Sequence, residues 1–123
     1  MTRVFVSGGR DYQDRGRVFQ EMDRLDDGLG ISLVIHGACM KKGGIELQGA
    51  DRWAEEWAKS RERAYIGLPA EWTKYGRPAG PRRNGDLIRR MKPEFGLLFP
   101  GGTGTADMAK QARANGIEVW EIG

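Results

Sequence analysis

Residues 95–105 of the chain read Phe-Gly-Leu-Leu-Phe-Pro-Gly-Gly-Thr-Gly-Thr. The largely apolar run 95–99 is typical of a strand buried in a parallel sheet, and it ends at a proline followed by three glycines within four residues. The next residues, 105–114, are predicted to form a helix. A buried strand that leads through a glycine-rich turn directly into a helix is the building unit of an α/β fold.

The same unit recurs along the rest of the chain. Short apolar runs alternate with segments whose apolar residues lie three and four positions apart, as on one face of a helix. Strands are predicted at 4–6, 31–35, 64–68, 95–99 and 117–122, and helices at 15–25 (ending before Gly28), from about 50 onward, at 81–91 and at 105–114. We therefore expect an α/β fold: a single Rossmann-like, doubly wound domain over residues 1–123, with five mostly parallel strands and helices on both faces.

Composition limits the possible functions. The chain has 123 residues, of which 39% are hydrophobic, enough for one core but not for two. Its 20 Lys and Arg against 17 Asp and Glu leave a net charge of +3, which we interpret as a mild excess spread through the chain. A charge so small does not indicate nucleic-acid binding, so a nucleic-acid partner is not expected.

Cysteine and apolar patterns suggest a cellular setting. The chain holds one cysteine, Cys39, and no pair of Cys or His residues has the spacing of metal ligands, so neither a disulfide nor a metal site is expected. No motif indicates a cofactor. The sequence has no apolar run long enough for a signal peptide or a membrane span, and we expect a cytoplasmic protein with no membrane partner.

The glycine-rich turn after the fourth predicted strand is the most informative segment. Successive backbone amides and two threonine hydroxyls at the start of a helix can together hold a phosphate. The segment is not a Walker loop, because the Lys-Ser/Thr ending is missing. The candidate phosphate-binding residues are Pro100, Gly101, Gly102, Thr103, Gly104 and Thr105.

The turn after the first predicted strand has a similar composition. Residues Ser7, Gly8, Gly9 and Arg10 are followed by Asp11. The backbone amides of this turn are expected to be free, and they and the Arg10 guanidinium suit a phosphate. The alternative is a tight strand-to-helix turn in which Asp11 caps the helix. The pattern is not GxGxxG, so it does not predict a dinucleotide site.

Two further loops follow the second and third predicted strands. His36 and Gly37 begin the first of them, and His36 either contacts ligand or is a hydrogen-bonded structural histidine. Asp51 opens the next helix, where it either caps that helix or accepts hydrogen bonds from a sugar. Lys41 and Lys42 either meet phosphate or form a solvated loop tip.

The loop after the third predicted strand adds an aromatic residue and a cation. Trp72 either stacks on a base or fills the rim between helices. Arg83 and Asn84, at the start of the predicted third helix, can bind phosphate or ribose. Ligands of open α/β sheets bind outside the carboxyl ends of the strands, and all four loops follow such ends.

Together these motifs resemble the SLOG superfamily of Rossmann-like domains, and within it the small YspA-like branch. The resemblance extends over nearly the whole chain. It is carried by four segments: Ser7-Gly8-Gly9-Arg10-Asp11, His36-Gly37 with Gly49-Ala50-Asp51, Trp72 with Gly76 and Ala79-Gly80-Pro81 through Arg83-Asn84, and Pro100-Gly101-Gly102-Thr103-Gly104-Thr105-Ala106-Asp107-Met108. It implies a nucleotide or nucleotide-derived ligand. The superfamily includes the lonely-guy phosphoribohydrolases and the DNA-processing protein A.

The chain departs from the hydrolases at the catalytic position. Their Pro-Gly-Gly-x-Gly-Thr-x-x-Glu motif ends in a glutamate, and the matching residue here is Met108, which cannot carry a proton. Asp107 is adjacent but points about 100° away around a helix. Arg83 matches the hydrolase arginine, whereas the lysine after it is Asn84. The segment 39–48 is also longer than the branch leads us to expect.

Three functions remain open at this point. The first is binding of a nucleotide-like small molecule, by a sensor or by a protein that sequesters a signalling nucleotide. The second is a nucleotide N-glycosidase in which Asp107, Asp51 or Asp11 supports the transition state and Arg83 holds phosphate. The third is single-stranded nucleic acid binding, against which the small net charge argues.

An oligomeric state is also expected from the chain. The resemblance implies a homodimer or a higher homo-oligomer. Trp53 and Trp57 lie on one stripe of the predicted second helix, where they either supply apolar surface for a dimer or are buried in the core.

Overall fold

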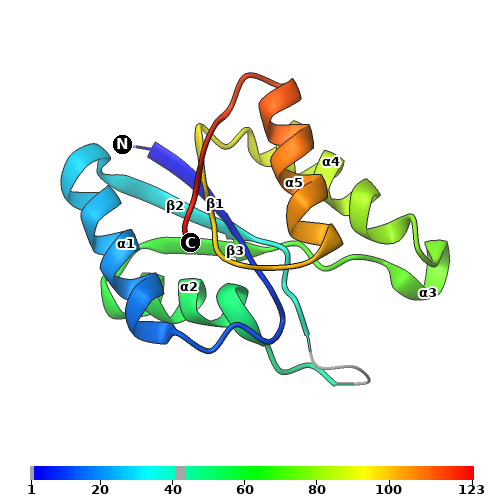
Figure 1. Ribbon diagram of the computed structural model, residues 1–123, viewed down its shortest axis with the longest axis horizontal. Coiled ribbons are helices and arrows are strands. Elements are labelled where there is room, and N and C mark those ends of the chain that lie inside the picture. The colour runs from blue at the N-terminus through cyan, green and yellow to red at the C-terminus, as the bar shows by residue number, and fades with distance from the viewer. Residues whose placement is uncertain (1, 41–43) are drawn as a thin grey trace.

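The computed structural model describes residues 2–40 and 44–123, in which strands and helices alternate (Figure 1). Its elements are β1 (Thr2–Ser7), α1 (Arg15–Leu29), β2 (Ile31–His36), α2 (Gly49–Ser60), β3 (Ala64–Gly67), α3 (Trp72–Tyr75), α4 (Ala79–Met91), β4 (Phe95–Leu98), α5 (Thr103–Ala114) and β5 (Glu118–Glu121). All five predicted strands and all four predicted helices are present. The one additional element is the short α3.

The five strands form one sheet in the order β3-β2-β1-β4-β5, and every neighbouring pair is parallel. The predicted α/β, Rossmann-like architecture is therefore confirmed, with a sheet that is entirely rather than mostly parallel. Strands β1, β2 and β3 follow one another toward one edge of the sheet, and β4 and β5 then follow on the other side of β1. The strand order therefore reverses between β1 and β4. In such sheets the crevice at this switch point is where ligands bind.

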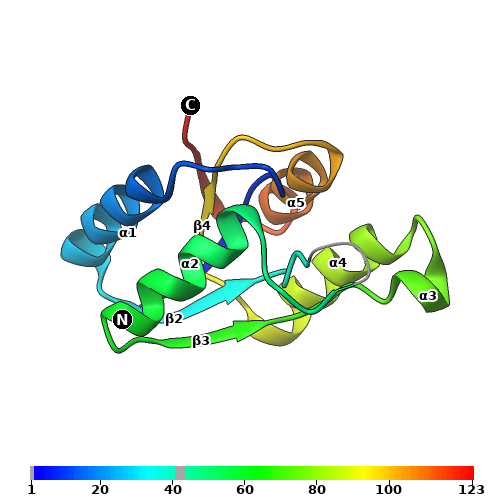
Figure 2. The same ribbon diagram turned by 90° about the horizontal axis from the view of Figure 1, so that it is seen from below.

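Helices cover both faces of the sheet (Figure 2). Side chains of α1 and α2, among them Met22 and Trp57, pack on Val4 and Val6 of β1. The other face of β1 presents Phe5 to Met108 of α5 and to apolar side chains of α4. Because both faces are buried, the central strands are continuous apolar runs, which is why they were recognisable in the sequence. Among the described residues no helix is both long and apolar enough to cross a bilayer.

Several helix boundaries differ from the prediction. Helix α1 does not stop before Gly28 but continues to Leu29, and Gly30, at φ +70°, ends it by donating its N–H to the Asp26 carbonyl. At position 28 an added Cβ would meet nothing within 4 Å beyond the nearby backbone of the helix itself, so no contact requires a glycine there. The residue that caps α1 is Asp14, whose carboxylate accepts from the Arg17 N–H at 3.0 Å, and not Asp11. The position of a cap depends on where the chain turns, which the spacing of apolar residues does not specify.

Both tryptophans of α2 form hydrogen bonds with other residues of the same chain. Trp57 is fully buried and donates its indole N–H to Asp23 at 2.9 Å. Trp53 is partly buried and donates to the Tyr12 carbonyl at 2.9 Å. Burial in the core is therefore confirmed for Trp57, whereas Trp53 is only packed against the core, and the expected homo-oligomer stays a prediction.

Asp23 gives a first prediction, about stability. Its carboxylate accepts from the Trp57 indole and from the Arg61 guanidinium, and these contacts, led by the Arg61 hydrogen bond, lower its pKa. We expect Asp23→Ala to lower the free energy of unfolding by about 1–2 kcal/mol, mainly because the buried indole N–H loses its acceptor; the partly exposed ion pair adds little.

The pH dependence of this effect has a definite sign. A carboxylate with a lowered native pKa contributes stability above the unfolded value of about 3.9, and the contribution is lost as the pH falls through the native value. In urea unfolding, the difference in unfolding free energy between the parent and Asp23→Ala should therefore become smaller below about pH 4. The exposed neighbour Asp27 serves as the control, and an equal loss in Asp27→Ala would contradict the assignment.

Candidate functional site

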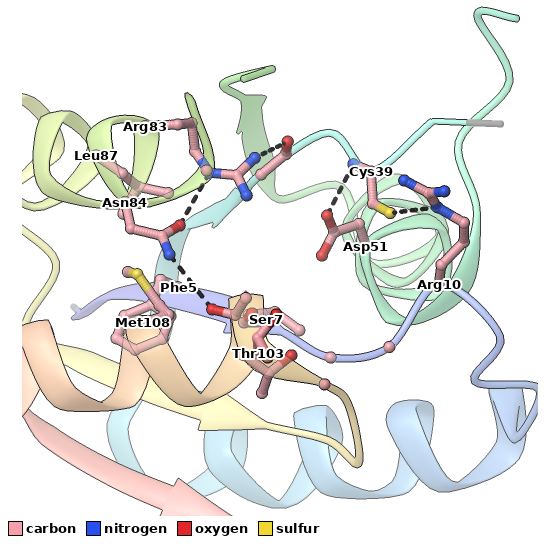
Figure 3. Close-up of a pocket in the computed structure, with 18 of the residues that line it drawn as sticks. Phe5, Ser7, Arg10, Cys39, Asp51, Arg83, Asn84, Leu87, Thr103 and Met108 are labelled. Carbon is pink, nitrogen blue, oxygen red and sulfur yellow. Dashed lines mark hydrogen bonds between the residues drawn. The ribbon is translucent and has the colours of Figure 1, made fainter. Parts of the chain in front are cut away.

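The four predicted loops meet at the switch point of the sheet, around a pocket of about 380 Å³ (Figure 3). Its lining includes Ser7, Gly8, Gly9 and Arg10 after β1, Gly37, Cys39 and Asp51 around the β2–α2 loop, Trp72, Gly80, Arg83 and Asn84 of α3 and α4, and Gly102, Thr103, Gly104 and Thr105 at the start of α5. Of the other candidate residues, His36, Pro100, Gly101 and Asp107 do not line it. Parallel strands end at one edge of a sheet, and this brings segments nearly 100 residues apart into one pocket.

The start of α5 presents unpaired amides to this pocket. Helix α5 begins at Thr103, two residues earlier than predicted, and the first N–H with a bond into the turn is that of Ala106, to the Gly102 carbonyl at 3.1 Å. Among the described residues, the N–H groups of Thr103, Gly104 and Thr105 have no acceptor. Free amides at a helix N-terminus, where the backbone dipoles add partial positive charge, form an anion-binding surface.

The turn after β1 lines the pocket, but not all of its amides are free as predicted. The Gly9 N–H is not free: it donates to the Pro100 carbonyl at 2.8 Å. A Cβ on Gly8 would lie 2.6 Å from the Ala50 Cβ, and one on Gly9 would lie 3.0 Å from the Pro100 oxygen. These glycines are therefore required by the close approach of two loops and of α2. Pro100 and Gly101 belong to this contact and do not line the pocket, whereas residues 102–105 do.

Arg83 is anchored by carbonyl groups at the floor of the site. Its Nη1 donates to the carbonyls of Gly37 and, at 3.2 Å, Leu68, and its Nε donates to the Asn84 Oδ1 at 2.9 Å. A side chain on Gly37 would overlap the guanidinium, so glycine is needed there. Burial lowers the Arg83 pKa from its ordinary value, against the opposing effect of Asp51. The result is a cation whose position is set before any ligand arrives.

Asn84, which lines the pocket, and Asp107, which does not, link α4 to α5. The Asn84 side chain is 4% exposed and donates from Nδ2 to the Asp107 Oδ2 at 2.9 Å. The same Asp107 oxygen accepts from Gln111 at 2.7 Å. Helix α4 starts at Ala79, so Asn84 lies in its second turn and not at its start as predicted. The Asp107 carboxylate thus holds Asn84, which in turn orients Arg83.

Asp51 is a buried carboxylate on the wall of the pocket. It lies in the first turn of α2 and is 5% exposed, but it does not cap that helix: the N-cap is Gln48, which makes no side-chain bond. Its Oδ2 accepts instead from the Cys39 N–H at 2.9 Å, across the β2–α2 loop. Burial raises the pKa of the Asp51 carboxyl, and the nearby His36 is the strongest of the influences that oppose this rise.

The raised pKa of Asp51 makes a second prediction. Because the native carboxyl keeps its proton to higher pH than the unfolded chain does, the free energy of unfolding falls as the pH rises from about 3.9 through the native value. Asp51→Asn cannot titrate and should not show this fall. Urea unfolding between about pH 4 and pH 7 should show the variant gaining stability relative to the parent. If the difference in unfolding free energy between Asp51→Asn and the parent stays constant across this range, the pKa of Asp51 is not raised in the native state.

His36 has the structural role that was one of its two alternatives. It is 1% exposed at the end of β2, its Nδ1 accepts from the Ala38 N–H at 3.0 Å, and its Nε2 bonds Glu55 at 2.9 Å. Ala38 has a φ of +51°, which the histidine helps to hold. His36 therefore stabilises the conformation of the β2–α2 loop and does not line the pocket.

The rim of the pocket is formed by Trp72 and Arg10. Trp72 is 54% exposed, and its ring edge lies over Gly80, where a Cβ would be 3.1 Å from Cη2. Arg10 lies across the opening with its Nε 3.5 Å from the Cys39 sulfur, and this contact is the main cause of its raised pKa. The long 39–48 segment closes through a bridge between Met40 and Leu47, whereas Lys41 and Lys42 lie outside the described residues.

Some lining residues had been missed. Cys39 was considered only for disulfides and metals, although its place two residues after Gly37 put it in a candidate loop. Phe5, Leu87 and Met108 form the apolar floor of the pocket and were interpretable only as core. A single apolar position at a strand or helix gives no signal of whether it faces a cavity or another side chain.

The parallel sheet with a pocket at its switch point defines a Rossmann-like α/β protein. The family model described as the YspA, cpYpsA-related SLOG family matches residues 2–75, more than half of the chain, and the chain belongs to that family. The match covers the turn after β1, the β2–α2 loop and α3; the α4 and α5 parts of the pocket lie beyond it. No curated protein matches the chain significantly.

Proposed function

We propose that the chain binds a nucleotide or nucleotide-derived molecule in the switch-point pocket. One observation carries this proposal: the free amides of Thr103, Gly104 and Thr105 line the same pocket as the anchored guanidinium of Arg83. Two positively polarised groups on opposite walls suit one anionic group between them. Membership of the SLOG family, which suggests nucleotide-related binding or glycosidase activity, supports the same ligand class.

The remaining lining residues suit the other parts of a nucleotide. The carboxyl group of Asp51 is available to ribose hydroxyls, and the exposed face of Trp72 at the rim is available for stacking on a base. Arg10 closes the opening from the other side. The volume of about 380 Å³ lies in the range typical of small-molecule sites. A protein of this kind would act as a sensor or as a store of its ligand.

Binding is favoured over hydrolysis by the carboxylates of the site. Met108 occupies the position of the hydrolase glutamate and is 2% exposed. Asp107 is bonded to Asn84 and Gln111 and does not line the pocket. The glycosidase alternative would therefore depend on Asp51 or Asp11, the two carboxylates among the lining residues.

The test is a titration with matched probes. AMP, adenosine, ribose 5-phosphate and inorganic phosphate are each added while tryptophan fluorescence and calorimetric heat are followed. AMP should bind at least about tenfold more tightly than adenosine, because only AMP reaches the α5 amides. Trp72→Phe should remove the fluorescence change and leave the calorimetric binding detectable. Equal affinities for AMP and adenosine, or no binding of any probe at millimolar concentration, would overturn the proposal.

The same samples distinguish binding from hydrolysis. Chromatography of AMP after incubation with the protein should detect no free adenine above the level of a protein-free control. Release that is lost in Asp51→Asn but kept in Asp107→Asn would assign hydrolysis to the pocket and replace the binding proposal with the glycosidase alternative.

A further inference from the structure

Positive charge is concentrated in one segment of the chain. Residues 72–92 contain seven Lys and Arg and one Asp, a net charge of +6, whereas the whole chain carries +3. The rest of the chain is therefore net negative, at −3. The interpretation of an excess spread along the sequence is wrong. The segment 72–92 forms α3 and α4, which lie together at one end of the molecule in both views (Figures 1 and 2).

The cations of this segment are largely free of acidic partners. Elsewhere in the described residues most Lys and Arg side chains pair with a carboxylate: Arg3, Arg15, Arg17, Arg24, Arg52, Lys59, Arg61, Arg63 and Arg113. On α3 and α4, Arg89 pairs with Asp86, and Lys74 reaches Glu71 only at 4.0 Å. The exposed side chains of Arg77, Arg82 and Arg90 have no acidic partner within the described residues.

Two of these cations, Arg82 and Arg90, border a groove between β3, α3 and α4, which adjoins the nucleotide pocket because Arg83 lines both. The groove has a volume of about 470 Å³ and an apolar floor that includes Ile66, Leu68 and Pro69. Arg82 and Arg90 lie eight residues apart on α4, on one stripe of the helix about 12 Å long. Two acids, Glu71 and Asp86, also line it, so cations outnumber acids along its walls.

An aromatic ring is already combined with this charge. The Arg82 guanidinium lies 4.1 Å from the centre of the Tyr75 ring, and the Lys74 ammonium lies 5.1 Å from it. The Tyr75 ring holds the guanidinium of the exposed Arg82 at the groove, where a planar group of a ligand can also contact it. A cationic groove with planar and apolar surfaces suits a flexible strand whose phosphates and bases are both accessible.

We propose that this α3–α4 groove, formed by Arg82, Arg90, Tyr75 and the floor 66–69, binds single-stranded nucleic acid. The phosphates lie along the Arg82–Arg90 stripe, and the bases contact the Arg82–Tyr75 pair and the apolar floor. Duplex DNA is a poorer partner because its bases are stacked inside and cannot reach that floor. An acidic protein segment would use the charge but not the planar surface. The proposal is tested at Arg82 and Arg90, neither of which lines the nucleotide pocket, whereas Arg83 lines both cavities and is left unchanged.

The experiment is fluorescence anisotropy with a labelled oligothymidylate of about 20 nucleotides. The double variant Arg82→Glu/Arg90→Glu should weaken binding at least about tenfold at 50 mM salt, and parent binding should fall steeply between about 50 and 200 mM. The control Arg24→Glu/Lys110→Glu has the same net charge and should stay within about threefold of the parent. Circular dichroism melting shows that each variant is folded, and AMP titration shows that the nucleotide pocket is unaffected.

Three results would overturn the proposal. Equal loss in both double variants would mean that only net charge matters. Tighter binding of a duplex of the same length would exclude a single-strand site. Binding of polyglutamate in place of oligothymidylate, lost in Arg82→Glu/Arg90→Glu, would assign the groove to an acidic protein partner.

Discussion

Replacing Thr103 by Asp is expected to stabilise the fold while removing most nucleotide binding. Thr103 is exposed in the first turn of α5, where the amides of residues 103–105 have no acceptor among the described residues. A carboxylate there interacts favourably with the helix dipole and should raise the free energy of unfolding by about 0.3–1 kcal/mol. The same carboxylate occupies the place of a phosphate and repels it, so AMP affinity should fall at least about tenfold.

Thr103→Asn is the matched control, because it has nearly the shape of Asp without the charge. Its AMP affinity should lie much nearer the parent value than that of Thr103→Asp, and its melting temperature should not rise. Melting curves and calorimetric titrations of the three proteins give both quantities. If Thr103→Asp binds AMP as the parent does, the phosphate does not lie at α5. If both variants lose affinity equally, the cause is shape and not charge.

Replacing Gly96 by Ala is expected to cost about 2–3 kcal/mol of stability, a large effect for one methyl group. Gly96 lies in β4 beside Phe5 of β1, and a Cβ built on it overlaps the Cε2 and Cζ atoms of that ring. Phe5 is fully buried and packs against α4 and α5, so the methyl group fits only if the ring is displaced from these contacts toward the pocket that it borders. Urea unfolding measures the loss directly.

A second substitution tests the cause. Phe5→Leu replaces the ring by a smaller side chain and should make Gly96→Ala less damaging. The loss of unfolding free energy in the double variant should therefore be about 1 kcal/mol smaller than the sum of the losses in the two single variants. Strictly additive losses would mean that the ring is not responsible. Gly28→Ala is the control: a Cβ added to Gly28 in α1 would meet nothing within 4 Å beyond the nearby helix backbone, and alanine there should stabilise by about 0.5–1 kcal/mol.

Much of the fold was predictable because its signals are local. The buried strands are continuous apolar runs bounded by glycine or proline, and α1 and α2 carry their core residues at helical spacing. The short helix α3 was not predictable, because Trp72–Tyr75 is one turn long and has no buried residues. The starts of α4 and α5 were placed two residues late, since a helix terminus depends on the path of the incoming chain.

The candidate site was predictable in its location and only partly in its residues. Glycine-rich turns after strands pointed to Gly102, Thr103 and Gly104, which line the pocket. The same reasoning did not reveal that the Gly9 amide is bonded to Pro100, or that His36 faces Glu55. Each of those contacts joins segments that are distant in sequence, so no local pattern encodes it.

By itself, the sequence determined the alternation of strands and helices, and with it the parallel sheet and the edge at which its loops gather. This information is local, because a buried strand or an amphipathic helix is specified by neighbouring residues. Only the tertiary structure decided which polar groups remain free: the amides of 103–105 do, whereas Gly9 and Asn84 are bonded across loops and helices. It also decided that Arg82 and Arg90 of α4 line one groove, where neither is paired with a carboxylate of the described residues. Hydrogen bonds and ion pairs form between whichever groups the packed core brings together, and that choice is made only when the chain is folded.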